Sequence, residues 1–359
     1  MTALIVASQF LLYASLSVVM GTMIMQCVPT TYRPGFQIAP KWLVLSVIVI
    51  PIAAFLPNLQ LLSILGPQFG LLESLWMIIS KYKVGHAWLA IFGFALLLLI
   101  IVRVATKKAS TWLYVCAIFV LLAIMAAIGY ASHAGSMAGI AGSFLEFIHL
   151  LAVSVWLGIL VIVGYFSTNT KNWSAFLQWF SPTALAAFTS IAISGVLMME
   201  VIVPKYVTSW AGTYGQFLFI KHVLLVPLAI IILANGLLIK LKINQPLFEP
   251  RTWVKIELTL LAAILVVTAI FTEQQPPNFT VEAISPFFEL FYHNSVATGM
   301  HAYLQMTGIG IMFFVLTAVF IGLTMVSYLK QLPTIFAAAM IAATALCFYM
   351  GFMSIVFFK

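Results

Sequence analysis

The sequence contains no aspartate, only three cysteines and few charged side chains, and each shortage excludes a class of protein. Without aspartate the chain cannot form the aspartyl-phosphate of an ion-pumping ATPase, and it has no GxxxxGKS or GxxxxGKT phosphate loop. The cysteines are far apart, so no disulfide framework or CxxC metal motif is present. Charged residues are 7% and hydrophobic residues 64% of the composition, which is more apolar surface than a water-soluble domain can bury. The sequence therefore predicts a polytopic membrane protein, and we expect it not to be an enzyme.

A cluster of basic residues, which would indicate nucleic-acid binding, is also missing. The formal net charge is +8, but the sixteen Lys and Arg residues are dispersed along short loops. We therefore expect no nucleic-acid partner and interpret these residues as a signal of membrane topology. The N-terminus has neither a basic leading segment nor a small-residue cleavage site after its apolar stretch, so we expect Met1 to Met25 to be retained as a helix.

Ten hydrophobic runs approach the roughly 20 residues that a helix needs to cross a bilayer. They lie near 3–25, 42–65, 86–102, 112–132, 143–166, 183–203, 217–239, 256–272, 303–326 and 334–357. The second run is the least regular because Pro51 and Pro57 interrupt it, and we expect it to end early and continue as an interfacial segment through Trp76 to Lys83. The expected fold is all-α, a polytopic transmembrane helix bundle of about ten spans.

The distribution of basic residues orients this bundle, because cytoplasmic loops collect Lys and Arg. Eleven of them lie in alternate loops that we assign to the inside: Arg33, Lys41, Arg103, Lys107, Lys108, Lys171, Lys240, Lys242, Arg251, Lys255 and Lys330. Five lie on the opposite side: Lys81, Lys83, Lys205, Lys221 and Lys359. Both termini are therefore expected outside.

With this orientation, metal-binding side chains collect at the outer face or in the outer leaflet. All six histidines belong to this layer: His86, His133, His149, His222, His293 and His301. Glutamates and methionines join them: Glu73, Glu146, Glu200, Glu273, Glu282, Glu289, Met137, Met198, Met199, Met300 and Met306. Histidines buried only for packing would have no reason to sort by side, so the layer predicts a metal-binding function.

Glu146 and His149 are the most informative pair. A spacing of three places both side chains on one face of a helix, where a carboxylate either supplies a second metal ligand or fixes the tautomer of the imidazole ring. The alternative is a buried pair that tethers neighbouring helices. An ionisable residue inside a membrane span is a functional candidate by default, and we favour the metal site.

The other histidines have weaker signals. His222 follows Lys221 on one helix, and the two side chains point about 100° apart, so His222 could face the bundle as a ligand while Lys221 pairs with Glu146 or Glu200 or reaches outward. His133 lies in a short loop, His-Ala-Gly-Ser-Met, that is held close to Glu146 and His149 and could receive the metal. A merely solvated loop histidine is the alternative reading for His133.

His293, Met300 and His301 surround the predicted start of the ninth span. Thioether and imidazole groups together suit copper better than calcium or magnesium, which prefer oxygen ligands. An ordinary interfacial loop explains the same residues equally well. A second sulfur cluster, Met20, Met23, Met25 and Cys27, lies at the inner end of the first helix, and there we favour apolar packing over transfer of Cu(I).

From Phe144 onward the sequence resembles the CopD family of membrane copper proteins. Three stretches over about 144–277 have this similarity, and Gly85-His86-Ala-Trp88 is a fainter match before them. The first is Glu146-Phe-Ile-His149 followed by Trp156-Leu-Gly158, the second is Gly212-Thr-Tyr-Gly215 with Lys221 and Asn235, and the third is Glu257 with the Thr-Glu-Gln-Gln-Pro-Pro end of the eighth span.

The resemblance implies passage of copper across the bacterial cytoplasmic membrane, in copper uptake or tolerance. Family members often have a periplasmic or extracellular β-domain of the CopC type, which this sequence lacks. A separate CopC-like external donor and a cytoplasmic copper chaperone are candidate partners, and the added His293 and His301 are candidates for part of the capture role. The expected domains are an N-terminal transmembrane region at 1–142, a CopD-like four-helix domain at 143–280, and an outer loop with two added helices at 281–359. His222 is not expected from the family pattern.

The leading hypothesis is a permease that imports copper, as Cu(I) or Cu(II), through an outer capture site. Its expected metal ligands are His149, Glu146, His133, His222, His293, His301, Met300 and His86. One alternative is a b-haem redox protein, because paired histidines on neighbouring membrane helices also bind haem. Another is a copper chaperone or assembly factor that holds the metal at the surface without transporting it.

Overall fold

The computed structural model describes residues 2–243, 248–277, 283–292 and 294–359. The chain is 81% helical with almost no strand, which confirms the predicted all-α bundle. It divides into two compact units, Met1–Ile202 (unit 1) and Val203–Lys359 (unit 2). This division and the three domains expected from the sequence use different boundaries, and the three-domain scheme stays a prediction.

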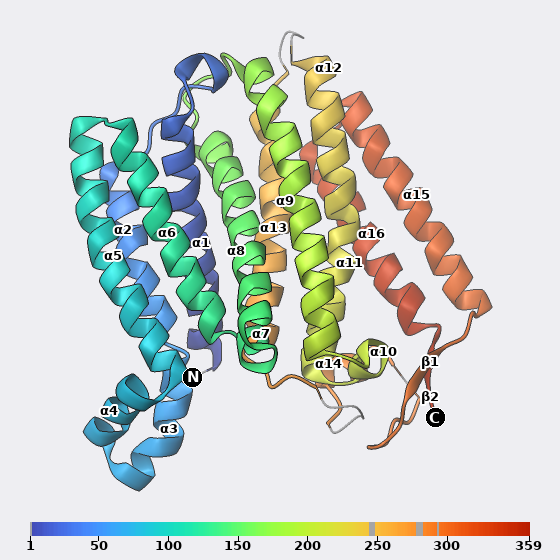
Figure 1. Ribbon diagram of the computed structural model, residues 1–359. Coiled ribbons are helices and arrows are strands. Elements are labelled where there is room, and N and C mark those ends of the chain that lie inside the picture. The colour runs from blue at the N-terminus through green and yellow to red at the C-terminus, as the bar shows by residue number, and fades with distance from the viewer. Residues whose placement is uncertain (1, 244–247, 278–282, 293) are drawn as a thin grey trace. The chain divides into compact units, whose positions relative to one another are not determined.

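Unit 1 is built of long helices joined by short turns (Figure 1). Its helices are α1 (Thr2–Cys27), α2 (Pro40–Phe55), α3 (Asn58–Phe69), α4 (Leu71–Lys81), α5 (Lys83–Lys108), α6 (Thr111–Ala131), α7 (His133–Met137), α8 (Gly139–Val161) and α9 (Trp173–Ile202), with a 3-10 turn η1 (Thr30–Tyr32) and a π-helical turn η2 (Ile162–Phe166). Helix α9 runs through Pro182 and begins ten residues before the predicted start of this span at 183.

Helices α1 and α8 approach so closely that two glycines are required at their crossing. A Cβ added at Gly21 would lie 2.1 Å from the carbonyl carbon of Gly158, and one added at Gly158 would lie 2.2 Å from the Ser17 carbonyl oxygen. Trp156, on the neighbouring turn of α8, is buried and meets Phe188 of α9 edge-on with ring centroids 6.1 Å apart. Helix α8, which contains the strongest candidate residues, is thus fixed on both sides inside unit 1.

The second span is broken, as its prolines predicted. Helix α2 continues through Pro51 and ends at Phe55, and the pair α2 and α3 is bent by 43° at the break. After Gly70, where φ is +82°, α4 turns back, and Trp76 on α4 is exposed.

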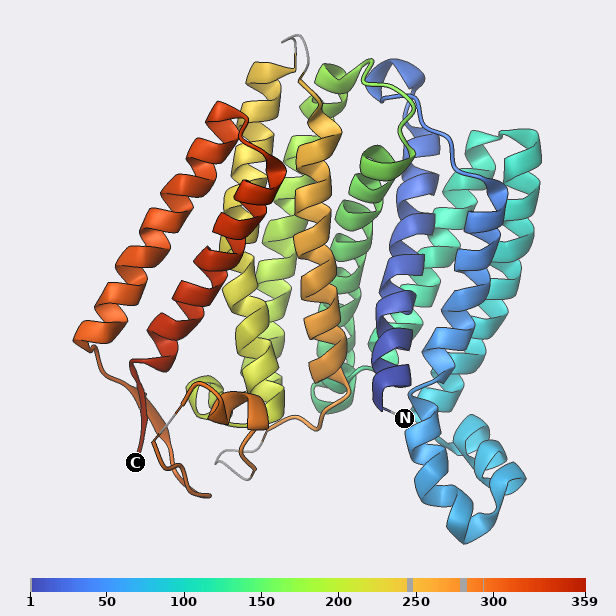
Figure 2. The same cartoon turned by 180° about the vertical axis from the view of Figure 1, so that it is seen from behind.

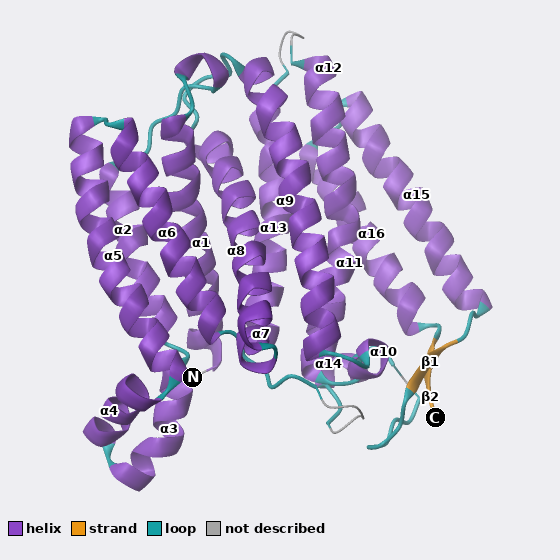
Figure 3. Cartoon of the chain, in the orientation of Figure 1, coloured by secondary structure: helices purple, strands orange, loops and turns teal. Residues whose placement is uncertain are grey.

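Unit 2 combines membrane-length helices with short elements, of which α10, α14, β1 and β2 lie at one end and α12 lies at the other (Figures 2 and 3). Its elements are α10 (Tyr206–Ser209), α11 (Thr213–Ala234), a π-helical turn η3 (Asn235–Ile239), α12 (Lys240–Lys242), α13 (Pro250–Thr272), α14 (Pro286–Glu289), β1 (Ala302–Leu304), α15 (Gly308–Lys330), α16 (Thr334–Met353) and β2 (Val356–Phe358). Aromatic residues of α10, α11, α14 and α16 form its core, with Trp210 stacked on Phe219 at 4.1 Å between ring centroids.

Two short strands stand where the sequence predicted helix. The ninth span was expected at 303–326, but Ala302–Leu304 is a strand that pairs antiparallel with Val356–Phe358, and α15 begins only at Gly308. Thr307 caps α15, because its hydroxyl oxygen accepts a hydrogen bond of 3.0 Å from the Gly310 N–H. The pairing extends to His301 and Lys359, which exchange backbone hydrogen bonds of 2.9 and 3.0 Å.

The helices are long and apolar enough to cross a membrane. Nine helices in the described ranges meet this condition, or ten if the bent pair α2 and α3 is one span. Large hydrophobic side chains on them point outward, including Ile100, Phe119 and Leu185, each more than half exposed. A surface of this kind requires lipid in place of water. The protein is therefore an integral membrane protein.

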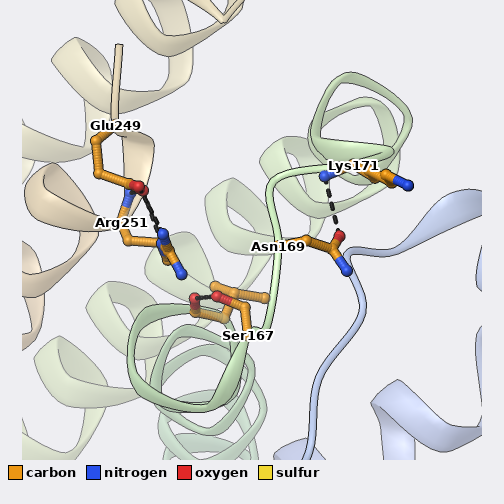
Figure 4. Close-up of polar contacts among 6 residues, drawn as sticks. Ser167, Asn169, Lys171, Glu249 and Arg251 are labelled. Atoms are coloured by element: carbon orange, nitrogen blue, oxygen red, sulfur yellow. Dashed lines mark hydrogen bonds and ion pairs between the residues drawn. The ribbon is translucent and has the colours of Figure 1, made fainter. Parts of the chain in front are cut away.

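Each unit has two ends that differ in composition. In unit 1 the basic end contains Arg33, Lys41, Arg103, Lys107, Lys108 and Lys171, and the histidine end contains His86 and His133. In unit 2 the basic end contains Lys242, Arg251, Lys255 and Lys330, and the histidine end contains His301. Contacts between residues two apart in sequence stabilise the turns at the basic ends (Figure 4). In unit 1, Asn169 Oδ1 accepts a hydrogen bond of 3.1 Å from Lys171 N, and in unit 2, Arg251 Nη2 forms an ion pair of 2.6 Å with Glu249 Oε2.

Candidate metal centre

His149 lies inside unit 1, between α8 and α9. It is ten residues after Gly139, the first residue of α8, which places it roughly 15 Å along the helix axis. Its side chain is half-buried, and its Nδ1 lies 3.0 Å from Oγ of Ser194 on α9. The hydrogen bond fixes the ring across two neighbouring helices.

The hydroxyl of Ser194 determines the tautomer of His149. Ser194 Oγ has a single hydrogen, which it donates to the backbone carbonyl of Ser190 at 2.6 Å. Because that hydrogen is used, Ser194 can only accept from His149, so Nδ1 of the imidazole has the proton. The lone pair is then on Nε2, the nitrogen that a metal would bind, and such a bond to the other ring nitrogen is usual for metal-ligating histidines.

The space around the ring is shaped by Gly195, the residue after Ser194. A Cβ at Gly195 would lie 3.6 Å from His149 Cε1, so the imidazole lies directly against the bare backbone of α9. Glu146 is half-buried on the same face of α8, one turn toward the histidine end. The predicted pair of carboxylate and imidazole therefore shares one face inside the unit.

The sequence suggested that His133 lies in a short loop. In the structure it is the first residue of the short helix α7. Ser132 caps α7, accepting from Gly135 N at 3.0 Å, and Lys83 Nζ donates to the Gly135 carbonyl at 2.9 Å. The His133 side chain is exposed, although α7 packs against α8. The segment is thus held at the start of the helix that contains Glu146 and His149.

His86 is exposed in the first turn of α5. Its Nε2 lies 2.9 Å from the Ser80 carbonyl oxygen, which can only accept, so Nε2 has the proton and Nδ1 has the lone pair. The hydrogen bond of His86 therefore links α4 to α5, whether or not His86 also binds metal.

His222 on α11 is half-buried in unit 2 among aromatic side chains. Its Nδ1 lies 2.5 Å from the hydroxyl oxygen of Tyr206, and the two rings meet edge-on at 5.3 Å between centroids. Burial raises the pKa of the Tyr206 phenol, which therefore stays neutral at working pH. Lys221 was expected to pair with Glu146 or Glu200 or to reach outward. The structure places its Nζ 5.4 Å from the centroid of the Phe271 ring, within reach of a cation–π contact.

The remaining predicted ligands lie in the segment before α15. His301 is exposed, and Met300 is half-buried with its Sδ 3.3 Å from the backbone nitrogen of Ala297. His293 lies outside the described residues. Met137 and Met306, which the sequence placed in the same outer layer, are exposed.

Within either unit, no three His, Cys or Glu side chains of the described ranges are close enough to hold a metal together. His149 and Glu146 share one helix face, His133 lies on the adjoining helix, and His86 lies on the first turn of α5. His222 and His301 belong to unit 2. The predicted ligand set as a whole stays a prediction.

The residues that orient the histidines were not predicted from the sequence. Ser194 and Tyr206 are distant in sequence from His149 and His222, and only the packing of α8 on α9 and of α10 on α11 brings them together. The spacing of Ser190 and Ser194, one turn apart on an apolar helix and followed by Gly195, was the available signal.

The fold and this site define a polytopic helical membrane protein with oriented histidines inside the bundle. Two family models match the chain: "Copper resistance protein D" over residues 174–271 and "Copper resistance protein D-like, N-terminal domain" over residues 1–143. The chain belongs to the copper resistance protein D family, the CopD family that its sequence resembles. The match includes the N-terminal region, where the resemblance was faint, while Glu146 and His149 lie between the two matched ranges.

One relative is the copper transport protein CutJ of Bacillus subtilis (strain 168). It is 30% identical over 155 residues, which are 41% of this chain and 28% of CutJ. The chain thus spans less than a third of the length of this curated relative. No solved structure matches the chain.

Proposed function

We propose that the protein is a copper permease of the bacterial cytoplasmic membrane, not an enzyme, and that it moves copper inward. Copper is captured at the outer face, which is the histidine end of each unit. The metal then passes to the basic end, which faces the cytoplasm. Membership of the copper resistance family and the name of the relative CutJ support copper as the cargo.

The single observation that carries the proposal is the orientation of His149. An imidazole whose orientation is fixed by a hydrogen bond to a neighbouring helix, inside an apolar bundle, is a ligand that suits a soft or borderline metal ion. Glu146 supplies a carboxylate on the same helix face, and the exposed His133 and His86 receive the ion at the histidine end of unit 1. His222, His293, Met300 and His301 are the corresponding capture residues in our scheme for unit 2.

The membrane potential is the energy source for import. An inside-negative potential stabilises an entering cation by about 2.3 kcal/mol per charge per 100 mV. Export would need a coupling device, and the sequence contains no phosphate loop and no aspartate for an aspartyl-phosphate. An external donor of the CopC type and a cytoplasmic copper chaperone are the partners that this route would use.

The test is copper entry into vesicles that contain the purified full-length protein, followed with a copper-sensitive dye in the lumen. Wild type is expected to admit copper, and His149→Ala is expected to admit at least about tenfold less, because one ligand is lost. Ser46→Ala, which changes an exposed hydroxyl on α2, serves as the control. Copper that binds to the vesicle surface without entering would instead indicate a chaperone, and a Soret band in the purified protein would indicate a haem protein.

A further inference from the structure

Near the basic end of unit 2, polar side chains from separate helical segments meet inside the protein. Glu257 of α13 is 4% exposed, Asn235 at the end of α11 is 7% exposed, and Tyr328 of α15 is 3% exposed. Glu257 is seven residues after Pro250, the first residue of α13, which places it roughly 10 Å along the helix and within the apolar layer. A carboxyl group at this depth requires a function or a strong structural reason.

Direct contacts join these residues into one cluster, which we call the inner polar cluster (Asn235, Trp253, Glu257 and Tyr328). Asn235 Nδ2 donates to Glu257 Oε2 at 2.7 Å and lies 3.5 Å from the Trp253 carbonyl oxygen. The Trp253 ring packs on Tyr328 with centroids 4.0 Å apart. Asn235 also begins η3, a π-helical turn, and such turns are rare and frequent at functional sites.

Two polar atoms of this cluster are buried without a hydrogen-bond partner in the described part of the chain. They are Oδ1 of Asn235 and the phenol oxygen of Tyr328. Native proteins pair almost all buried polar atoms, because an unmade hydrogen bond in a dry interior is costly. Two such atoms in one cluster, one of them on the residue that binds the buried carboxyl group, indicate that the cluster binds something in part of its working cycle.

The chemistry of the cluster favours a proton as this ligand. Its polar side-chain groups are a carboxyl, an amide and a phenol, with no thioether or imidazole to suit Cu(I). Calcium and magnesium take six or more oxygen ligands, which is more than these three side chains supply. A proton on Glu257 turns the carboxyl into a donor, and Asn235 Oδ1 can accept its hydrogen bond once the amide has rotated.

We propose that Glu257, Asn235 and Tyr328 form a proton-binding site that opens to the inner side and is loaded and emptied during copper transport. The amide of Asn235 serves both states, because it donates through Nδ2 to the ionised carboxylate and, after rotation, accepts through Oδ1 from the protonated carboxyl. The coupling to copper rests on the proposed function, whereas the proton site itself does not.

Among the side chains that the structure describes, the charged groups near this cluster lie at the basic end of the unit. Lys242 Nζ donates to the Leu329 carbonyl at 2.6 Å and lies 3.4 Å from the Tyr328 carbonyl, Arg251 pairs with Glu249, and Lys255 and Lys330 are exposed. Helix α16 and the half of α11 after His222 contain no charged residue. A copper ion in this half of the unit and a proton on Glu257 are both positive, so each disfavours the other.

Two measurements test the site. Infrared spectra of the full-length protein are expected to show a protonated-carboxyl carbonyl band that disappears as the pH rises, and Glu257→Gln is expected to lose it. In vesicles with the basic end facing the lumen, copper entry is expected to slow as the lumen is acidified, and Glu257→Gln is expected to lose this dependence. Glu249→Gln, at the exposed ion pair of the same helix, is the matched control and should retain both signals.

The outcomes separate the two proposals. A titrating band in a protein that admits no copper would keep the proton site and contradict copper transport. An unchanged band together with an unchanged pH profile in Glu257→Gln would overturn the proton site, whether or not copper enters. Should Glu257→Gln fail to fold, Tyr328→Phe removes only the unpartnered hydroxyl, and it must shift the midpoint of the band for the proposal to stand.

Discussion

Ser194 and His149 form a hydrogen bond between α9 and α8, with Oγ and Nδ1 3.0 Å apart, in which the serine accepts and the imidazole donates. The serine hydrogen is donated to the Ser190 carbonyl, so Nδ1 of the neutral imidazole has the proton and Nε2 has the lone pair. A residue that makes no contact with copper would in this way decide whether copper can bind.

Ser194→Ala is expected to weaken copper binding by about 10–100-fold, the usual effect of removing the partner of a metal-bound histidine. Without the hydroxyl, the ring can rotate and adopt either tautomer. Copper affinity of the purified protein, measured by competition with a chelator, checks this. Ser194→Thr keeps the hydroxyl and should recover most of the affinity; equal affinities of Ser194→Ala and wild type would rule out the orienting role.

Tyr206→Phe is expected to lower the free energy of unfolding by about 1 kcal/mol, because it removes the hydroxyl that bonds Nδ1 of the half-buried His222. The ring itself is kept, so the edge-on contacts of Tyr206 with His222 and Trp210 survive. Thermal unfolding in detergent measures the change. Tyr32→Phe, at an exposed tyrosine, is the control. A similar loss of stability in that variant would mean that the hydrogen bond of Tyr206 makes no specific contribution.

Gly21→Ala is expected to destabilise unit 1 by about 1–3 kcal/mol, because the added methyl group overlaps the backbone of Gly158. Backbone cannot move aside as a flexible side chain can, so α1 and α8 must separate. Gly93→Ala, on α5 with open space around its Cβ position, should be neutral or stabilising by about 0.5–1 kcal/mol. Melting temperatures of the two variants in one detergent compare them, and equal values would contradict the close crossing.

The ion pair at the start of α13 predicts a small loss of stability in acid. The Arg251 guanidinium, through its hydrogen bond, holds the pKa of the Glu249 carboxyl below its ordinary value. A lowered folded-state pKa means that the stabilisation is complete above about pH 4.3, the unfolded value, and is lost as the pH falls through the folded pKa. Because both side chains are about one-third exposed or more, we expect less than about 1 kcal/mol.

Thermal unfolding of Glu249→Gln between neutral pH and pH 3 checks this sign. Wild type should lose more stability than the variant over that range, and the two should converge in acid. A difference that widens as the pH falls would show that the pair opposes folding. High salt should reduce the difference, because the pair is partly exposed to solvent.

The helical spans were predictable because a segment that crosses a membrane must form its backbone hydrogen bonds within itself and present apolar side chains to lipid. Long apolar runs in the sequence reveal such segments. The break after Phe55 was also readable from Pro51 and Pro57. The start of α9 was not, since the predicted run began at 183 whereas the helix begins at Trp173 and continues through Pro182. Strands β1 and β2 were missed because Ala302–Leu304 is apolar enough to extend a span, and only its pairing with a segment more than fifty residues away reveals the strand.

The candidate site was predictable only in part. The spacing of Glu146 and His149 follows from helix geometry, so their common face could be read from the sequence. The partners Ser194 and Tyr206 could not, because serine and tyrosine are common on apolar helices and only tertiary packing selects these two. Glu257 and Asn235 were noticed through family resemblance, but their hydrogen bond required the structure.

The helices that contain the two half-buried histidines, α8 and α11, both run into a π-helical turn at the basic end. Such a turn has one residue more than an ordinary helical turn. If one residue is removed from Ile162–Phe166 or Asn235–Ile239, the remaining residues can therefore form a regular α-helix. The same deletion between His149 and Trp156 would rotate everything beyond it by about 100° and turn buried groups toward lipid. Comparisons among relatives should therefore find single-residue gaps at these two turns and not within the helices that precede them.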